Sequence, residues 1–489
     1  MMTAVQTRIS NIFDATVGRL WITRIWDSLD REVHSNGRAL TRPDILLSLM
    51  LGACGIAVSI WAFFQTGRVP ELHTMTELWL QADVPRAAEN MVTTAGNHGR
   101  TSVHPIYSIL LYPVGRLLMA LGAEPLLAAK MVTVFVMGAN VTLFSLTTRL
   151  LGLPQFAMAL FSVLFMATAS FMFWSGVVES YPFSCLSVLI ALFLMFRVKT
   201  AHGAWWMLAN VLTLGFLVTN WLFALIAMAV RLKMKPFLTI GAASFAFVAV
   251  LSVVQNQTFE KAAIFFNPEP LLRESQFLQP AMQADGAYEE GWRPSANLRS
   301  MYVTTVVAMP AYAQQQRFMR VTTSNQNSGF PPGEISPVIA VIAWVVLLGA
   351  GVWGAVSRRE FRLPLLGAGL MLTAQTMLHL VYGEVTFLYS LSFMPLILLL
   401  ASQAWFAPYR KVGIAMAGIV IVFGGINNER RLQEQVEIAD CLSELDTVQR
   451  LQKWELAKDE IVIRPEDEAE LQVNTHDLCG TISPSRPES

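Results

Sequence analysis

The stretch between residues 71 and 122 gathers ionisable side chains between two long apolar runs. These side chains are Asp83, Arg86, Glu89, His98, Arg100 and His104. A carboxylate can accept a proton from a hydroxyl, and arginine or histidine can neutralise a phosphate group. The rest of the chain is poor in charge, so we expect any group-transfer chemistry to take place in this stretch.

Asp83 has a structural interpretation beside the chemical one. It precedes Val84 and Pro85, and a helix that begins there would place Asp83 at the N-cap, where a carboxylate is favoured. Arg86 and Asn90 would then share one helix face. As a cap, Asp83 would stabilise the helix and do nothing more, whereas as a general base it would accept the proton of an attacking hydroxyl. The sequence leaves both interpretations open.

The cationic side chains of the same stretch are candidates for binding a phosphate group. Arg86 and Arg100 can each bind two phosphate oxygens with one planar guanidinium, which makes arginine better suited than histidine. His98 and His104 are further candidates. For all four residues, the alternative is a surface charge beside lipid headgroups.

Three more ionisable residues stand at the ends of apolar runs. Glu179 lies in a short polar loop before Pro182, where it can bind substrate or cap the following helix. His379 and Glu384 flank the end of a later run, with Tyr382 between them. They can bind a headgroup or a sugar, or anchor the span at the membrane interface.

The composition is that of a polytopic membrane protein. Hydrophobic residues make up 54% of the chain and charged residues 14%, whereas a soluble domain has about 25% charged residues. The 35 basic and 35 acidic residues cancel, so no overall field attracts nucleic acid. No cleavable signal peptide is expected, because the first long apolar run begins only near Ile45. Of the four cysteines, Cys441 and Cys479 could pair if their polar segment lies in an oxidising compartment.

Apolar runs predict an all-α bundle of about eleven transmembrane helices over residues 45–426. Single crossings are predicted at 45–64, 126–148, 156–173, 182–196, 237–254, 337–356, 363–382, 387–402 and 412–426. Residues 205–230 lie between two basic clusters and are too short for two full spans, so we predict a hairpin of two short helices that turns near Thr219 and Asn220.

Basic residues set the predicted orientation. Arg116 and two prolines interrupt the segment 106–122, which we therefore expect to lie in the interface as a juxtamembrane helix. With that choice, the basic clusters between spans, from Arg149 to Lys411, all lie in the cytoplasm. The first loop, residues 71–122, is then external.

Three segments are expected outside the helical bundle. Residues 1–44 form a cytoplasmic amphipathic segment on the membrane surface. Residues 255–336 form a large external loop without regular structure, mobile without ligand and ordered over the site when a donor binds. Residues 427–489 form an external tail with a short helical element around 442–456.

The layout of residues 45–426 resembles the GT-C superfamily of membrane glycosyltransferases, which includes protein O-mannosyltransferases and aminoarabinose transferases. The shared features are an outward first span, an acidic residue in the first external loop, a juxtamembrane helix that starts at His104-Pro105, the acidic loop Glu179-Ser180-Tyr181-Pro182, and the short hairpin. Many relatives carry an Asp-Glu pair in the first loop, whereas Asp83 is followed by Val84 and Pro85.

The resemblance implies a glycosyltransferase, inverting at the sugar carbon, that uses a polyprenyl-phosphate-linked donor. The acceptor would be a hydroxyl of a glycan, lipid or protein at the outer face of a bacterial inner membrane, with the N-terminus cytoplasmic and the C-terminus external. Asp83 would be the catalytic carboxylate. The donor phosphate and substrate would be bound by Arg86, Arg100, His104, His98, Glu179, His379 and Glu384. No organic cofactor is implied, and assistance by a divalent cation stays open.

Two other functions are compatible with this sequence. One is a lipid or polysaccharide transporter, and the other is a polysaccharide polymerase or ligase of the cell envelope. Transporters often contain internal repeats and ionisable residues at mid-membrane. This sequence contains no internal repeat, and its acidic residues lie near the outer ends of the predicted spans, which favours an enzyme. It also contains no Walker motif, dinucleotide-binding glycine pattern or Cys/His metal cluster.

Overall fold

The computed structural model describes residues 40–197, 202–274, 294–315, 321–358, 361–383 and 385–458. Over these ranges the regular structure is helical apart from one two-stranded sheet, which confirms the predicted all-α membrane fold. Most of the predicted amphipathic segment 1–44 lies outside the described residues, as do Glu384 and Cys479.

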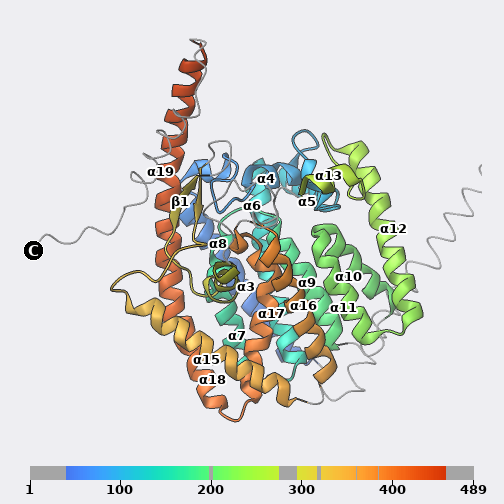
Figure 1. Ribbon diagram of the computed structural model, residues 1–489. Helices are drawn as coiled ribbons and strands as arrows, with labels where there is room; N and C mark the ends of the chain where they lie inside the picture. The colour runs from blue at the N-terminus through green and yellow to red at the C-terminus, as the bar shows by residue number, and fades with distance from the viewer. Residues whose placement is uncertain are drawn as a thin grey trace, which may run out of the picture.

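The elements before the long loop comprise three long helices and a series of shorter helices. They are α3 (Arg42–Thr66), η2 (Pro70–His73), α4 (Val84–Val92), η3 (Gly99–Ser102), α5 (Tyr107–Ala120), α6 (Pro125–Leu150), α7 (Gln155–Ala167), α8 (Ala169–Ser175), α9 (Tyr181–Arg197), α10 (Gly203–Phe216), η4 (Val218–Asn220), α11 (Trp221–Arg231) and α12 (Met234–Thr258). Figure 1 shows α4 and α5 with α13 at one end of the helical bundle, which we call the site end.

The second half of the chain contains the remaining long helices and the only described sheet. Its elements are α13 (Pro268–Arg273), α14 (Pro294–Arg299), η7 (Ser300–Thr304), β1 (Tyr312–Gln315), β2 (Val321–Ser324), α15 (Ile335–Ser357), α16 (Arg362–Val381), η10 (Thr386–Tyr389), α17 (Ser390–Ser402), η11 (Gln403–Phe406), α18 (Arg410–Ile419), η12 (Val420–Gly424) and α19 (Gly425–Lys458). Strands β1 and β2 pair antiparallel, and α19 projects beyond the bundle at the site end (Figure 1).

Seven helices of the described chain are long and apolar enough to cross a membrane, and the bent pair α7–α8 makes an eighth if it is one span. Four apolar helices are shorter, among them α5 with 14 residues and α9 with 17. At 1.5 Å per residue α5 is about 21 Å long, less than the ~30 Å hydrocarbon core, and its place in the interface stays a prediction. The count of eleven crossings stays a prediction, because α9 and both hairpin helices are among the short ones.

The segment 205–230 folds as the predicted hairpin. Helices α10 and α11 have 14 and 11 residues, and the 3-10 turn Val218–Asn220 joins them at the predicted position. Two basic clusters flank the hairpin, as the argument from charge required. The turn lies at the site end, because the Val218 N–H donates to the Val103 carbonyl at 3.1 Å.

Three details differ from the sequence prediction. The span predicted at 156–173 is bent by 59° between α7 and α8, where the Thr168 hydroxyl accepts a hydrogen bond from the Phe171 N–H. The predicted tail helix at 442–456 is not separate, because α19 runs unbroken from Gly425 to Lys458 and continues from the last span through η12. The long loop 255–336 was predicted to lack regular structure, but its described parts contain short helices and the β1–β2 pair.

A network of polar contacts fixes the end of the bundle opposite the site. Asp44 caps the start of α3 by accepting the Thr41 N–H at 3.0 Å, and its other oxygen pairs with Arg149 at the end of α6, also at 3.0 Å. The Arg358 guanidinium at the end of α15 donates to the Leu151 carbonyl at 2.6 Å. The start of α3 and the ends of α6 and α15 therefore lie together.

Glycines allow α15 to approach the chain at the end of α17 without intervening side chains. A Cβ atom at Gly354 would overlap the carbonyl oxygen of Gln403, and one at Gly351 would overlap that of Leu400. Gly349 lies on the same helix and faces open space. Small residues at helix contacts of this kind are typical of membrane proteins.

We predict that Gly354→Ala destabilises the protein and that Gly349→Ala does not. The added methyl group at residue 354 must push two backbones apart, and overpacking of this kind costs roughly 1–3 kcal/mol. At residue 349 the better helix propensity of alanine should stabilise by up to about 1 kcal/mol. Thermal unfolding of the two variants in the same detergent measures the difference, and equal melting temperatures would contradict the proposed packing.

Candidate functional site

The loop that carries Asp83 is held in an unusual backbone conformation. Leu80 and Gln81 have φ values of 51° and 65°, a left-handed region that costs a residue with a side chain about 1–2 kcal/mol. Strand β2 stabilises this conformation, because the Leu80 N–H donates to the Thr323 hydroxyl at 3.2 Å and the Gln81 N–H to the Thr322 hydroxyl at 3.0 Å. The strand thereby fixes the position of Asp83 at the start of α4.

Asp83 occupies the N-cap position of α4, but its side chain accepts no capping hydrogen bond, so the interpretation as a helix cap is wrong. Its carboxylate instead forms an ion pair with Arg86, one helical turn further on. The Asp83 and Arg86 side chains are 25% and 20% exposed, so the pair is largely enclosed yet remains open on one side. This carboxylate is therefore accessible and fixed by a single cation.

The carboxylate of Glu179 contacts the backbone of Asp83. One of its oxygens accepts the Asp83 N–H at 3.1 Å, and the other accepts both the N–H and the hydroxyl of Ser180 at 2.8 Å. Burial raises the pKa of the Glu179 carboxyl, while the Ser180 hydrogen bonds and the Arg86 charge oppose that shift. Since both oxygens already accept hydrogen bonds and the side chain is buried, the geometry fits a residue that positions Asp83.

Arg86 and Arg100 place two positive charges in the same region. Burial and the charge of Arg100 together lower the pKa of Arg86 to about 10, so Arg86 stays protonated at neutral pH. Arg100 pairs with Glu274 at 2.5 Å, and the Tyr382 hydroxyl donates to the second Glu274 oxygen at 2.7 Å. In this state a carboxylate of the long loop lies against the Arg100 guanidinium.

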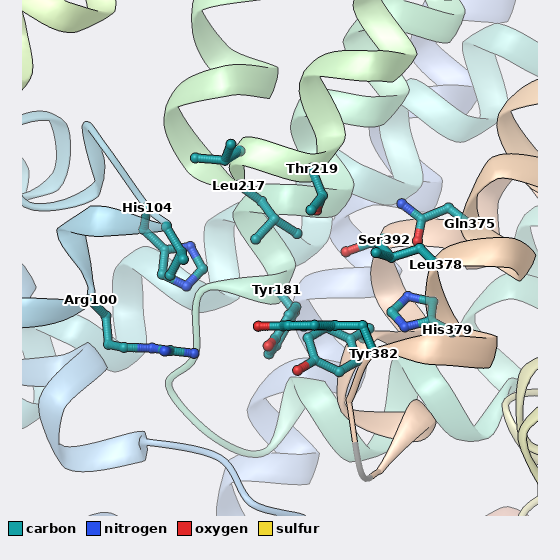
Figure 2. Close-up of a pocket in the computed structure, with 13 residues that line it drawn as sticks. Arg100, His104, Tyr181, Leu217, Thr219, Gln375, Leu378, His379, Tyr382 and Ser392 are labelled. Carbon is teal, nitrogen blue, oxygen red and sulfur yellow. The ribbon is translucent and has the colours of Figure 1, made fainter. Parts of the chain in front are cut away.

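A cavity of about 50 Å³ adjoins Arg100. Its walls come from the loop before α5, the start of α9, the turn of the α10–α11 hairpin, and helices α16 and α17. Figure 2 shows Arg100 and His104 on one side of the cavity, Tyr181 and Tyr382 at its centre, and His379 on the other side. The cavity therefore joins segments that are far apart in the sequence.

His104 is a neutral hydrogen-bonding group in this site. Its Nδ1 lies 2.6 Å from the Phe216 carbonyl, which can only accept, so Nδ1 carries the proton and Nε2 has the free lone pair. Burial lowers the pKa of His104 to about 3. His104 therefore offers an acceptor to the cavity and supplies no positive charge to a phosphate group at neutral pH.

His98 belongs to the packing around α5. It is fully buried, its Nδ1 lies 2.8 Å from the Ser108 hydroxyl, and its ring packs against Phe259. It does not line the cavity. The structure thus places this phosphate-binding candidate outside the lining of the cavity that Arg100 and His104 share.

His379 lies in the cavity wall, and its role in binding substrate stays a prediction. Its ring stacks on Tyr389 with the centroids 4.8 Å apart. The Nδ1 of His379 and the side-chain oxygen of Gln375 are buried without a hydrogen-bond partner among the described residues. Buried polar atoms of this kind are costly unless a ligand or water pairs with them.

Two residues of this site were missed by sequence analysis. Glu274 lies in the long loop, and no local pattern marks it as a partner of Arg100. Gln375 could have been found, because it is a polar residue in an apolar helix and lies one turn before His379, on the same face. Among the described residues, no group of three or more His, Cys, Asp or Glu side chains could hold a metal ion.

Comparison of the chain with protein-family models, curated proteins and solved structures found no match. The functional assignment therefore rests on the residues and geometry of this site.

We predict that His104 makes the stability of the protein depend on pH. The pKa of a histidine rises from about 3 in the folded chain to its ordinary 6.5 on unfolding, so between these pH values only the unfolded chain binds the proton. The free energy of unfolding should fall as the pH drops below 6.5, by about 1.4 kcal/mol per pH unit for this one residue.

Thermal unfolding of the purified protein from about pH 7 to about pH 4 measures this dependence. His104→Gln should reduce the slope, while His202→Gln, an exposed histidine at the start of α10, serves as the matched control. An unchanged slope in His104→Gln would show that folding does not lower the pKa of His104.

Proposed function

We propose that this protein is an inverting glycosyltransferase that takes a sugar from a polyprenyl-phosphate donor at the outer face of a bacterial inner membrane. The observation that carries the proposal is the accessible Asp83 carboxylate, which makes no capping hydrogen bond and pairs with Arg86, a cation near enough to Arg100 for its pKa to respond to that charge. A base next to two phosphate-binding groups has the composition that transfer from a sugar phosphate requires.

In the proposed reaction Asp83 accepts the proton of the acceptor hydroxyl. The hydroxyl oxygen forms a new bond to the anomeric carbon from the face opposite the phosphate, and the bond between that carbon and the phosphate oxygen breaks. The electron pair leaves with the phosphate, so the configuration at the sugar carbon is inverted. Glu179 holds the Asp83 backbone, which keeps the base in place during the transfer.

The negative charge on the departing phosphate is stabilised by Arg86 and Arg100. Arg100 is paired with Glu274 in the structure, so the donor phosphate takes the place of the Glu274 carboxylate on the guanidinium. That exchange replaces one anion by another and leaves Arg100 paired in both states, which limits its cost. Glu274 is released together with the hydrogen bond it accepts from Tyr382.

Neutral groups of the cavity are suited to sugar hydroxyls. His104 offers the lone pair of Nε2, and Gln375 and His379 have buried polar atoms without partners among the described residues. Tyr181 and Tyr389 line the cavity with aromatic rings that can contact a sugar. The volume of about 50 Å³ is far smaller than a sugar, so this cavity must widen when the donor binds, and release of Glu274 is the available step.

The distribution of charge supports the proposed orientation. Asp44, Arg149 and Arg358 meet at the end opposite the site, and the basic side chain of Arg231 donates to the Met195 carbonyl near the end of α9. An excess of arginine and lysine marks the cytoplasmic side of a membrane protein. Cys441, which follows the last span in α19, is disulfide-bonded, as expected for an oxidising external compartment.

Reporter fusions test this orientation. A reporter that is active only outside the cytoplasm should work when fused after Ser489, and it should be silent when inserted between residues 199 and 202. A cytoplasm-specific reporter should give the opposite pattern. Activity of the cytoplasmic reporter after Ser489 would place Asp83 and Arg100 inside the cell and refute the proposed site of reaction.

The proposed role of Asp83 predicts a selective loss of turnover in Asp83→Asn. The asparagine keeps the shape of the side chain but cannot accept the proton, so transfer should fall roughly 10²–10⁴-fold. The melting temperature should change little, because Asp83 makes no capping hydrogen bond. Glu89→Gln removes the same charge from the exposed face of α4 and should leave turnover unchanged.

Mass analysis of polyprenyl-linked sugars in cells that express each variant provides the measurement. Cells with Asp83→Asn should accumulate the unused donor to the level of cells without the protein, while cells with Glu89→Gln should resemble the wild type. Normal donor levels in cells that make folded Asp83→Asn protein would remove Asp83 from the mechanism.

A further inference from the structure

A second cavity lies on the membrane-facing side of the molecule, between α3 and α6. It is a groove of about 590 Å³, within the range of ligand-binding cavities. Its walls are almost entirely apolar, and several wall residues are exposed to the surroundings, namely Ile60, Phe64, Leu127 and Phe135. In a membrane these side chains contact lipid chains.

Two cations border this groove, Lys130 and Arg68. Arg68 is the second residue after the C-terminal end of α3, and Lys130 is the sixth residue of α6, about 8 Å below the start of that helix. Both therefore lie near the membrane surface at the site end, at the depth where lipid phosphates are found. The groove thus has an apolar floor and a positively charged rim.

Lys130 has no ion-pair partner among the described residues, although its side chain is half-buried in a membrane-spanning helix. Its ammonium lies 5.4 Å from the centre of the Phe63 ring. Burial lowers the pKa of the nearby His73 imidazole, and the charge of Lys130 adds to that shift. Neither neighbour carries negative charge. An unpaired ammonium at this depth is unfavourable unless an anion accompanies it.

We propose that this groove binds one anionic membrane lipid, with the headgroup phosphate on Lys130 and Arg68 and an acyl chain along the apolar floor. The charges select an anionic headgroup over a neutral one, and the shape of the groove selects a chain-bearing molecule over a free ion. The proposal is independent of the proposed transferase activity, because none of the groove residues lines the Arg100 cavity.

Native mass spectrometry of the full chain in a non-ionic detergent tests this site. The wild type should bind one phosphatidylglycerol more tightly than phosphatidylcholine with the same chains. Each lysine or arginine near a phosphate adds about 1 kcal/mol, a factor of about five in affinity, so Lys130→Met should lose about fivefold for phosphatidylglycerol. Lys130→Arg should retain the binding.

Arg116→Gln is the matched control, since it removes a positive charge from the exposed face of α5 near the same end of the bundle. Its affinity for phosphatidylglycerol should equal that of the wild type. If Lys130→Met does not fold, Arg68→Gln at an exposed position replaces it and should show the same loss. Equal affinity of the wild type for the two lipids, or unchanged affinity in the folded groove variants, would overturn the proposal. Inorganic phosphate that stabilises the folded protein as much as phosphatidylglycerol does would also overturn the proposal, because that result would show a site for a free anion.

Discussion

Backbone groups that leave a helix inside a membrane must find partners within the protein, because hydrocarbon offers none. The fold meets this requirement with buried amide side chains. Asn428 alone pairs with three backbone groups: it donates to the Ala167 carbonyl at 2.8 Å and to the Val306 carbonyl at 2.7 Å, and it accepts the Ala308 N–H at 2.7 Å. One side chain of α19 thus holds both the break between α7 and α8 and the irregular segment after η7.

The same requirement builds the candidate site. The end of α10 and the turn after it pair with the segment before α5. The Ile106 N–H donates to the Gly215 carbonyl at 3.0 Å, and the Val218 N–H donates to the Val103 carbonyl at 3.1 Å. Gln255 donates to the Pro105 carbonyl at 2.8 Å and accepts the Ile109 N–H at 2.9 Å. His104 donates from Nδ1 to the Phe216 carbonyl at the end of α10, which leaves the lone pair of Nε2 free. Burial keeps the ring neutral by lowering its pKa, although this hydrogen bond acts in the opposite direction.

Sequence analysis found the helices because hydropathy is a local property, and it found the α10–α11 hairpin because basic clusters on both sides limited the possible crossings. It could not find the bend after Ala167, since that break is stabilised by Asn428, 261 residues away. In the site, Asp83 and Arg86 could be recognised from residue type as a candidate base and a candidate phosphate-binding residue. The roles of Glu179 and Glu274 were not, because each depends on a partner about 100 residues or more distant, Asp83 for the first and Arg100 for the second.

The positions of the described charges favour chemistry at the membrane surface over passage through the bundle. A carrier for a polar substrate needs polar groups along a path at mid-membrane. Among the described residues, the Asp44–Arg149 pair lies at one end of the bundle, and Asp83 and Arg100 lie at the other. Asn210, within α10, donates to the Trp206 carbonyl at 2.8 Å and accepts the Trp221 indole N–H at 3.0 Å, so its hydrogen bonds stabilise the hairpin. The charged groups of the candidate site therefore lie at one end of the bundle, which supports the proposed transfer at the membrane surface.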